Sequence, residues 1–185
     1  MENELTRCGW AKSDLEKEYH DNVWGKPLHD DHELFKKLIL DGQQAGLSWS
    51  IILKKMDGLC AVYDDFNPRL LAHYDTDKID ALLHDDRIIK NRAKINAAVH
   101  NAKCYFALCE KFGSLNAFLW HYVDGKTIVN HWKDLKEIPA TSPISDLISR
   151  DLKKLGFKFV GSTIVYAFMQ AIGMVNDHLV DCSFR

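Results

Sequence analysis

Apolar residues recur at three- and four-residue spacing from Asp30 almost to the end of the sequence, and this periodicity constrains the fold most strongly. Such a pattern is typical of helices that bury one face against their neighbours. No segment shows the signature of a strong β-hairpin. The sequence therefore predicts an all-α fold. The expected helices cover about 15–19, 30–40, 48–57, 91–112, 142–155 and 161–172, and shorter ones begin near Pro68, Thr76 and Ser114.

A chain of 185 residues can bury a real core, and we expect one domain over 1–185 made of two small helical lobes. No apolar run reaches about 18 residues, so no transmembrane helix is expected. The polar start at Met1–Glu4 argues against a signal peptide and favours a cytoplasmic protein. A formal net charge of −2 excludes a protein that coats DNA non-specifically, so any nucleic-acid surface must be local.

The segment Leu40–Trp49 joins two apolar helical runs and carries more hydrogen-bonding and stacking side chains than a turn requires. Asp41 follows an apolar stripe, and a partly desolvated carboxylate favours a cationic or N–H-rich partner. Trp49 offers a flat face for stacking. The alternative is an ordinary helix–loop–helix, in which Gly42 caps the first helix, Ser48 starts the second and Trp49 belongs to the core.

The segment 142–173 predicts a helix, a short turn bounded by Gly156 and Gly161, and a second helix, which resembles a helix-hairpin-helix. Free N–H groups at such a turn can bind a phosphate without reading sequence. Nearby lysines, including Lys158, supply a local positive field that the net charge does not. The alternative is a plain helical hairpin with a solvated lysine face.

Two cysteines and two histidines could form a metal site that ties the two ends of the chain together; the alternative is chance pairing among nine histidines and five cysteines. His178 and Cys182 have a spacing common for zinc ligands, and Cys8 with His20 could complete a tetrahedron. The segments 1–29 and 174–185 carry too little apolar surface to dock alone. Five cysteines form no compact framework, so we expect free thiols or metal ligands instead of disulfides.

Five separated segments resemble the DNA-3-methyladenine glycosylase I family in the family's own order. They are Arg7–Trp10, Tyr19–Gly25, Asp41–Trp49, Gly156–Gly161 and Val175–His178. The resemblance covers essentially the whole chain. It implies a helix-hairpin-helix glycosylase bundle that releases 3-methyladenine from double-stranded alkylated DNA, acting as a monomer without a membrane partner. It also implies one structural Zn²⁺ with a closed ligand set: Cys8, His20, His178 and Cys182.

A base must leave the duplex stack before its glycosidic bond can be cut, which requires a pocket, a plug for the gap and a phosphate anchor. The resemblance implies that Asp41 is the catalytic carboxylate. The residues implied for binding the base are Tyr19, Trp49, Trp10 and Glu16. Those implied for binding DNA are Gln44, Gly46 and Leu47 as the plug and Lys158, Gly161 and Ser162 as the anchor.

The chain departs from the family pattern at two of these positions. Most relatives carry Glu where this chain has Asp41, and many carry an aromatic residue where it has Glu16. Two other functions therefore compete with the enzyme: a non-catalytic binder of alkylated DNA or of free 3-methyladenine, and a metal-dependent hydrolase, which would need an open coordination position. We expect Asp177 to be a structural acid that orients His178.

Overall fold

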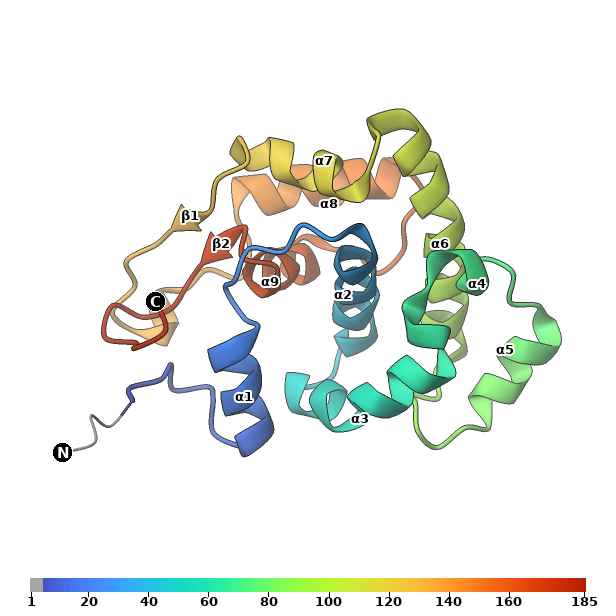
Figure 1. The fold of residues 1–185 in the computed structure, drawn as a ribbon, viewed down its shortest axis with the longest axis horizontal. Helices are drawn as coiled ribbons and strands as arrows, with labels where there is room; N and C mark the ends of the chain where they lie inside the picture. Colours follow the sequence, from blue (N-terminus) through green and yellow to red (C-terminus); the bar gives the residue numbers. More distant parts are fainter. Residues whose placement is uncertain (1–4) are drawn as a thin grey trace.

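The computed structural model describes residues 5–185, which fold into a mostly helical chain (Figure 1). This confirms the predicted class, and two short strands, β1 (Ile128–Val129) and β2 (Val175–Asn176), are the exception. Three short 3-10 helices lie at Asp64–Phe66, His121–Val123 and Leu135–Glu137. The α-helices are α1 (Asp14–Asn22), α2 (Asp31–Gln44), α3 (Trp49–Val62), α4 (Pro68–Leu71), α5 (Thr76–Leu83), α6 (Arg92–Phe112), α7 (Leu115–Trp120), α8 (Pro143–Lys154) and α9 (Ser162–Ala171).

Side-chain caps begin most helices at the predicted places. Asp30 accepts a hydrogen bond from the N–H of Glu33 at 3.0 Å, and Ser114 accepts one from Ala117 at 2.9 Å. These bonds satisfy N–H groups that the first helical turn cannot pair. Gly113 ends α6 with a φ of 88°, a left-handed conformation that glycine adopts without strain.

The predicted end of the first long helix is wrong. The helix α2 continues past Leu40 to Gln44, so Gly42 lies within its last turn instead of capping it. Glycine is needed there for close packing: a Cβ at Gly42 would lie 3.3 Å from the Cβ of Phe159, in the turn between α8 and α9. Asp41 is therefore held by regular helical backbone.

The predicted break at Asp57–Gly58 is also wrong, because α3 runs on to Val62. A Cβ at Gly58 would lie 2.8 Å from the carbonyl oxygen of Arg87. The glycine lets α3 pack against the chain before α6, and that packing outweighs its weak helix propensity.

The strands β1 and β2 pair in parallel, with Ile128 opposite Val175. The strand β1 lies inside 126–141, which was predicted to be irregular. The pairing places the C-terminal tail beside α1 and the N-terminal segment, at the left of Figure 1.

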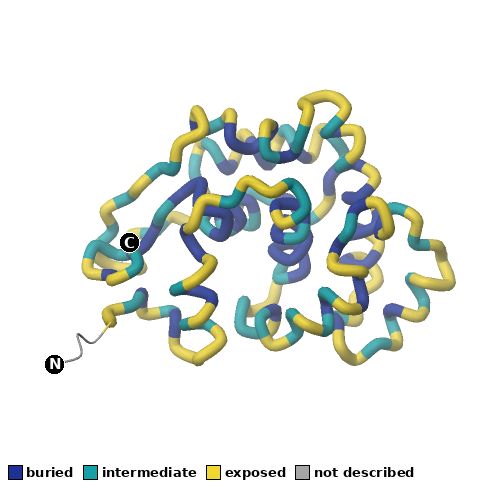
Figure 2. Tube along the Cα trace, in the orientation of Figure 1, coloured by how far each residue is buried: buried dark blue, intermediate teal, exposed yellow. Residues whose placement is uncertain are grey.

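The helix α2 lies at the centre of the fold and packs against α3, α6, α7 and α9. Its core-facing side chains include Leu34, Phe35 and Leu38, which are at most 1% exposed. Figure 2 shows α2 buried along most of its length. Three polar residues, Lys37, Asp41 and Gln43, are buried with it. No α-helix in residues 5–185 is long and apolar enough to cross a membrane.

Candidate active site

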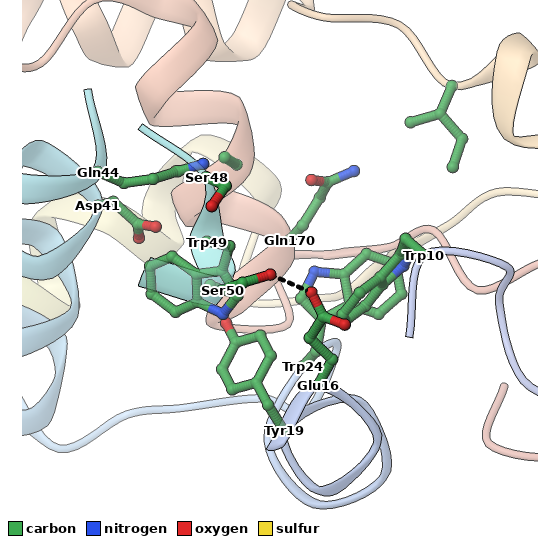
Figure 3. A pocket seen from close by; sticks show the side chains of 13 residues that line it. Trp10, Glu16, Tyr19, Trp24, Asp41, Gln44, Ser48, Trp49, Ser50 and Gln170 are labelled. Atoms are coloured by element: carbon green, nitrogen blue, oxygen red, sulfur yellow. Dashed lines mark hydrogen bonds between the residues drawn. The ribbon is translucent and has the colours of Figure 1, made fainter. Parts of the chain in front are cut away.

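A cavity of about 360 Å³ opens where α1, the end of α2, the start of α3 and α9 meet (Figure 3). It brings together all five residues that were predicted to bind or act on a base. The sequence analysis missed much of the remaining lining. The lining residues are Trp10, Glu16, Tyr19, Trp24, Asp41, Gln44, Ser48, Trp49, Ser50, Ile138, Ala167, Gln170 and Ala171.

Asp41 lines this cavity from the last turn of α2 and is 3% exposed. Its Oδ2 is buried and has no hydrogen-bond partner among the described residues. Burial raises the pKa of the Asp41 carboxyl to about 7, and the positive charge of Lys37 acts against that rise. An unpartnered buried carboxylate oxygen is costly, so its acceptor capacity is kept for something that enters the cavity.

Aromatic rings form two walls of the cavity. The rings of Tyr19 and Trp49 lie 5.2 Å apart, and those of Trp10 and Trp24 lie 5.1 Å apart. The indole Nε1 of Trp49 is buried and has no partner among residues 5–185. The cavity thus offers flat apolar faces together with one unused acceptor and one unused donor.

Glu16 lines the same cavity from α1, and its carboxylate is held from two sides. Its Oε2 accepts hydrogen bonds from the N–H of Ser13 at 2.9 Å and of Lys12 at 3.2 Å, and its Oε1 accepts one from the hydroxyl of Ser50. The bonds from Ser13, followed by that from Ser50, lower the pKa of Glu16 to about 2. The cavity therefore has a fixed second negative charge on its wall.

Lys37, which the sequence analysis did not single out, lies directly behind the aromatic wall. It is 8% exposed, and its Nζ donates to the hydroxyl oxygen of Tyr19 at 2.9 Å. The same Nζ lies 4.2 Å from the ring centroid of Tyr19 and 5.0 Å from that of Trp49. Burial lowers the pKa of the Lys37 ammonium to about 8, against the opposing effect of Asp41.

The loop 44–47 leaves α2 beside the cavity mouth and carries the residues that were predicted to plug DNA. Gly46 has a φ of 76°, and Leu47 is 36% exposed at the tip. The loop is tied to α6 by Lys94, another residue that the sequence analysis missed. The Nζ of Lys94 donates to the carbonyl oxygen of Gln43 at 2.8 Å and to that of Ala45 at 2.7 Å.

The hairpin of α8 and α9 presents its turn, residues 155–161, beside Gly42. Lys158 is exposed at this turn, and its backbone N–H and C=O both bond the side chain of Asn101. A Cβ at Gly161 would meet no atom within 4 Å. Because no side chain caps the N-terminus of α9, its first N–H groups remain available to a ligand.

Ser162, the third residue predicted at this anchor, is already engaged through its side chain. Its hydroxyl lies 2.8 Å from that of Ser145 and donates to the carboxylate of Asp146. The side chain therefore joins α9 to α8, and the residue faces a ligand only through its backbone.

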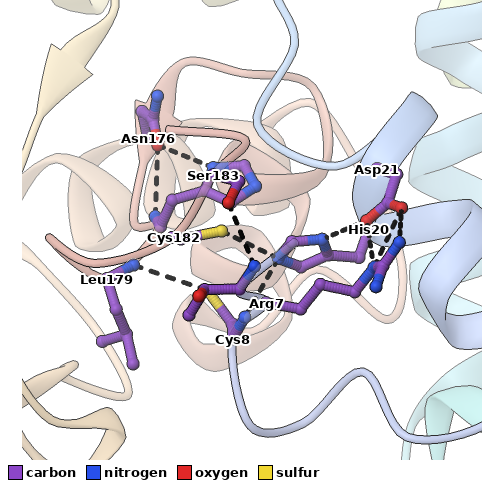
Figure 4. A network of polar contacts seen from close by, with 10 residues as sticks. Arg7, Cys8, His20, Asp21, Asn176, Leu179, Cys182 and Ser183 are labelled. Carbon is purple, nitrogen blue, oxygen red and sulfur yellow. Dashed lines mark hydrogen bonds and ion pairs between the residues drawn. The ribbon is translucent and has the colours of Figure 1, made fainter. Parts of the chain in front are cut away.

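The predicted metal ligands gather where the two ends of the chain meet (Figure 4). Donor atoms of Cys8, His20 and Cys182 lie within 4.8 Å of one another, and all three residues are buried. His178 adjoins them, with its ring centroid 4.8 Å from that of His20. Its Nε2 is buried and has no partner among residues 5–185. Cysteine and histidine are the residue types that bind zinc in structural sites.

Residues other than Asp177 orient the two histidines, which corrects the role expected for that acid. The Nδ1 of His20 bonds Asp21 at 2.8 Å, and the Nδ1 of His178 bonds the side-chain oxygen of Asn176 at 2.9 Å. Asp177 is fully buried, and its carboxylate accepts hydrogen bonds elsewhere. The donors are the side chains of Asn130, Trp132, Tyr166 and Gln170.

The chain is similar in sequence and in fold to known proteins. The family model for methyladenine glycosylases matches residues 10–185. DNA-3-methyladenine glycosylase of Haemophilus influenzae is 44% identical over 179 residues, which cover 96% of both chains. A crystal structure of 3-methyladenine DNA glycosylase I superposes with a TM-score of 0.94 at 42% identity, covering 96% of this chain and 98% of that one. The Staphylococcus aureus protein of that name, described for its recognition of 3-methyladenine, gives a TM-score of 0.93 at 36% identity, covering 98% and 97%.

Proposed function

The chain belongs to the methyladenine glycosylase family, and we propose that it is a DNA repair enzyme that hydrolyses the N-glycosidic bond of 3-methyladenine in alkylated DNA. The observation that carries the proposal is the buried carboxylate of Asp41, which has an unpartnered oxygen in a cavity walled by aromatic rings. Such a site selects a flat, electron-poor base with a hydrogen-bond donor.

Methylation at N3 gives the adenine base a positive charge while it is attached to the sugar. When the C1′–N bond breaks, the base keeps the bonding electron pair and becomes neutral, and water supplies a hydroxyl to C1′ and one proton to solvent. The leaving group therefore needs no protonation. The pocket has to hold and orient the extruded base. The negative charge of Asp41 favours the cation, and its carboxylate oxygen accepts a hydrogen bond from the exocyclic amine of the base.

The duplex is engaged by two surfaces beside the pocket. The loop 44–47 carries the exposed apolar tip of Leu47 next to the pocket residue Gln44, which suits it to fill the gap left by an extruded base. The turn 155–161 combines the open approach at Gly161 with the exposed Lys158, as in a helix-hairpin-helix that grips a phosphate. The nearby carboxylate of Asp146 opposes an anion, so the backbone N–H groups carry this contact.

We propose that Cys8, His20, His178 and Cys182 hold one structural Zn²⁺. The orphaned Nε2 of His178 and the convergence of the other donors support this fit. Four protein ligands leave no position for a water molecule, which argues against a metal-dependent hydrolase. When bound, the metal would join the N-terminal segment to the C-terminal tail.

One experiment separates an enzyme from a binder. Duplex DNA treated with a methylating agent is incubated with the protein, and the released bases are separated by chromatography. We expect free 3-methyladenine in the supernatant, and Asp41→Asn serves as the matched control. Tight binding of methylated DNA without release of any base would instead establish the non-catalytic alternative. We expect activity from a monomer.

A further inference from the structure

We propose that Lys37 is a positioning residue for base recognition: its ammonium favours the ionised form of Asp41 and turns the hydroxyl proton of Tyr19 away from itself. This inference rests on the proposed function, because it assigns a task to a residue behind the base pocket. Lys37 does not line the pocket, so it acts through these two residues.

The position of Lys37 is unusual for a lysine. It precedes Asp41 by one helical turn on α2, and the side chains of such a pair lie on the same helix face. It is 8% exposed, although the long lysine side chain normally reaches water with its charge. No carboxylate oxygen of residues 5–185 lies within 4.0 Å of its Nζ, so no direct ion pair offsets the cost of its burial.

The separation between Lys37 and Asp41 serves recognition. A direct ion pair would occupy an oxygen of Asp41 and compete with a base for it. At a longer distance the two charges still attract each other through a poorly polarisable interior. Lys37 therefore favours the ionised form of Asp41 while the Oδ2 of Asp41 remains unpartnered.

The contact between Lys37 and Tyr19 fixes a second polar group. A protonated lysine can only donate, so the oxygen of Tyr19 is the acceptor of the 2.9 Å hydrogen bond. The single phenolic proton must then point elsewhere. Tyr19 lines the pocket beside Asp41, so this orientation sets a hydrogen-bond donor next to the acceptor.

The other charges around Asp41 cannot replace Lys37. Acidic Glu16 and neutral Tyr19 face the pocket from α1, and Glu33 lies one turn beyond Lys37 on α2. The remaining lining residues carry no charge. They come from the end of α2, from α3, from α9 and from the loops that line the pocket. Lys37 is thus the cation that lowers the cost of ionising Asp41, and Glu33 in turn favours the charged form of Lys37.

The decisive variant is Lys37→Met, which keeps the approximate length and the apolar stem of the side chain but removes its ammonium group. Without the ammonium, the pKa of Asp41 should rise further above its ordinary value, because only burial remains. The acidic limb of the pH profile for single-turnover release of 3-methyladenine should therefore move up by about one pH unit. The loss should be about fivefold at pH 7 and should approach about tenfold at lower pH. Lys37→Arg should restore most of the wild-type profile.

The matched control is Lys36→Met, on the same helix. Lys36 pairs with Asp65 and Glu33 outside the pocket, so its removal should leave the acidic limb in place. Thermal unfolding is measured for all variants. A folded Lys37→Met protein whose pH profile coincides with that of the wild type would overturn the proposal.

A second measurement applies if Lys37→Met does not fold. The ¹³C resonance of the Asp41 carboxyl is titrated by NMR in the wild type and in Lys37→Arg, identified by its absence from Asp41→Asn. The proposal requires Asp41 to be substantially ionised at neutral pH in both proteins, and a carboxyl that stays protonated through pH 8 would refute it. This titration needs no activity, so it tests Lys37 even if the wild type releases no base.

Discussion

The Nζ of Lys94 lies 2.7 Å from the carbonyl oxygen of Ala45, and this contact fastens the loop 44–47 to α6. The same group also holds the carbonyl oxygen of Gln43 at 2.8 Å, and Gln43 returns a hydrogen bond to the carbonyl oxygen of Lys94 at 3.3 Å. The end of α2, which otherwise has unpaired carbonyl groups, is thus closed by a side chain from another helix. These contacts fix the conformation of the loop in the absence of DNA.

Lys94→Met should therefore impair the loop more than the pocket. Two carbonyl groups lose their donor, and we expect a loss of about 1–3 kcal/mol in the free energy of unfolding. Release of 3-methyladenine from duplex DNA should fall, whereas binding of the free base stays close to that of the wild type. Denaturant unfolding, duplex excision and fluorescence titration with free base check these outcomes. If excision survives the stability loss intact, Lys94 does not position the loop.

Asp41→Asn should reduce base recognition while keeping the shape of the side chain. The variant replaces an acceptor with a group that can present an amide nitrogen to the donor amine of the base. A hydrogen bond to a charged group contributes about 1.5–3 kcal/mol, so we expect a loss of roughly ten- to hundredfold in single-turnover release. Asp41→Glu, the family's usual residue, should preserve or raise excision. Equal rates for Asn and Asp at matched stability would move the search for the recognition residue to Tyr19 and Glu16.

The raised pKa of Asp41 predicts a pH-dependent cost in stability. The folded protein binds the proton of Asp41 more tightly than the unfolded chain, because burial disfavours the carboxylate. The stabilising effect of the protonated group is complete below the unfolded-state pKa of about 4 and is lost as pH rises toward the folded value of about 7. Between these limits the wild type should lose up to about 1.4 kcal/mol per pH unit relative to Asp41→Asn. Urea unfolding of both proteins at several pH values measures the difference, and parallel curves would contradict the shift.

The donor cluster at the chain ends predicts one zinc per chain. Metal bound only by the folded state adds its binding free energy to stability, so a strong chelator should lower the melting temperature and loosen both termini. Cys182→Ser should show a similar loss before any chelator is added. Elemental analysis and thermal unfolding test this, and a metal-free protein of undiminished stability would rule out a structural metal.

The hairpin turn predicts variants that separate DNA binding from base binding. Gly161→Val places side-chain atoms where a phosphate would approach, and Lys158→Ala removes one exposed positive charge. Both should weaken binding of duplex DNA, and Lys158→Ala should reduce its dependence on salt. Binding of free 3-methyladenine should change little, because the pocket is a separate site. Loss of both ligands in a folded variant would show that the two sites are not independent.

The sequence predicted those parts of the fold that depend on local chemistry. Caps such as Asp30 and Ser114 begin helices because their side chains satisfy nearby N–H groups, whatever the rest of the chain does. Gly42 and Gly58 misled the prediction because a glycine that permits close packing looks like a glycine that ends a helix. The pairing of β1 with β2 was invisible because two residues of each strand give no periodic signal.

The residues of the candidate site likewise fall into those that local sequence predicts and those that only tertiary packing reveals. Asp41 and Trp49 lie in one motif and were predicted to act together, and the fold places them in the same cavity. Lys37 and Lys94 were missed because a lysine in a helix normally points to solvent, and only tertiary packing shows these two to be buried. Ser50 carried no signal by itself, since its role depends on where α1 brings Glu16.

The contact between Gly42 and Phe159 joins the helix that carries Asp41 directly to the turn proposed to grip a phosphate. Because the backbone of α2 packs closely against the Cβ and backbone of Phe159, no long flexible side chain separates the two sites. The proposed phosphate contact would therefore place one nucleotide, at a constant number of steps along the strand, opposite the pocket.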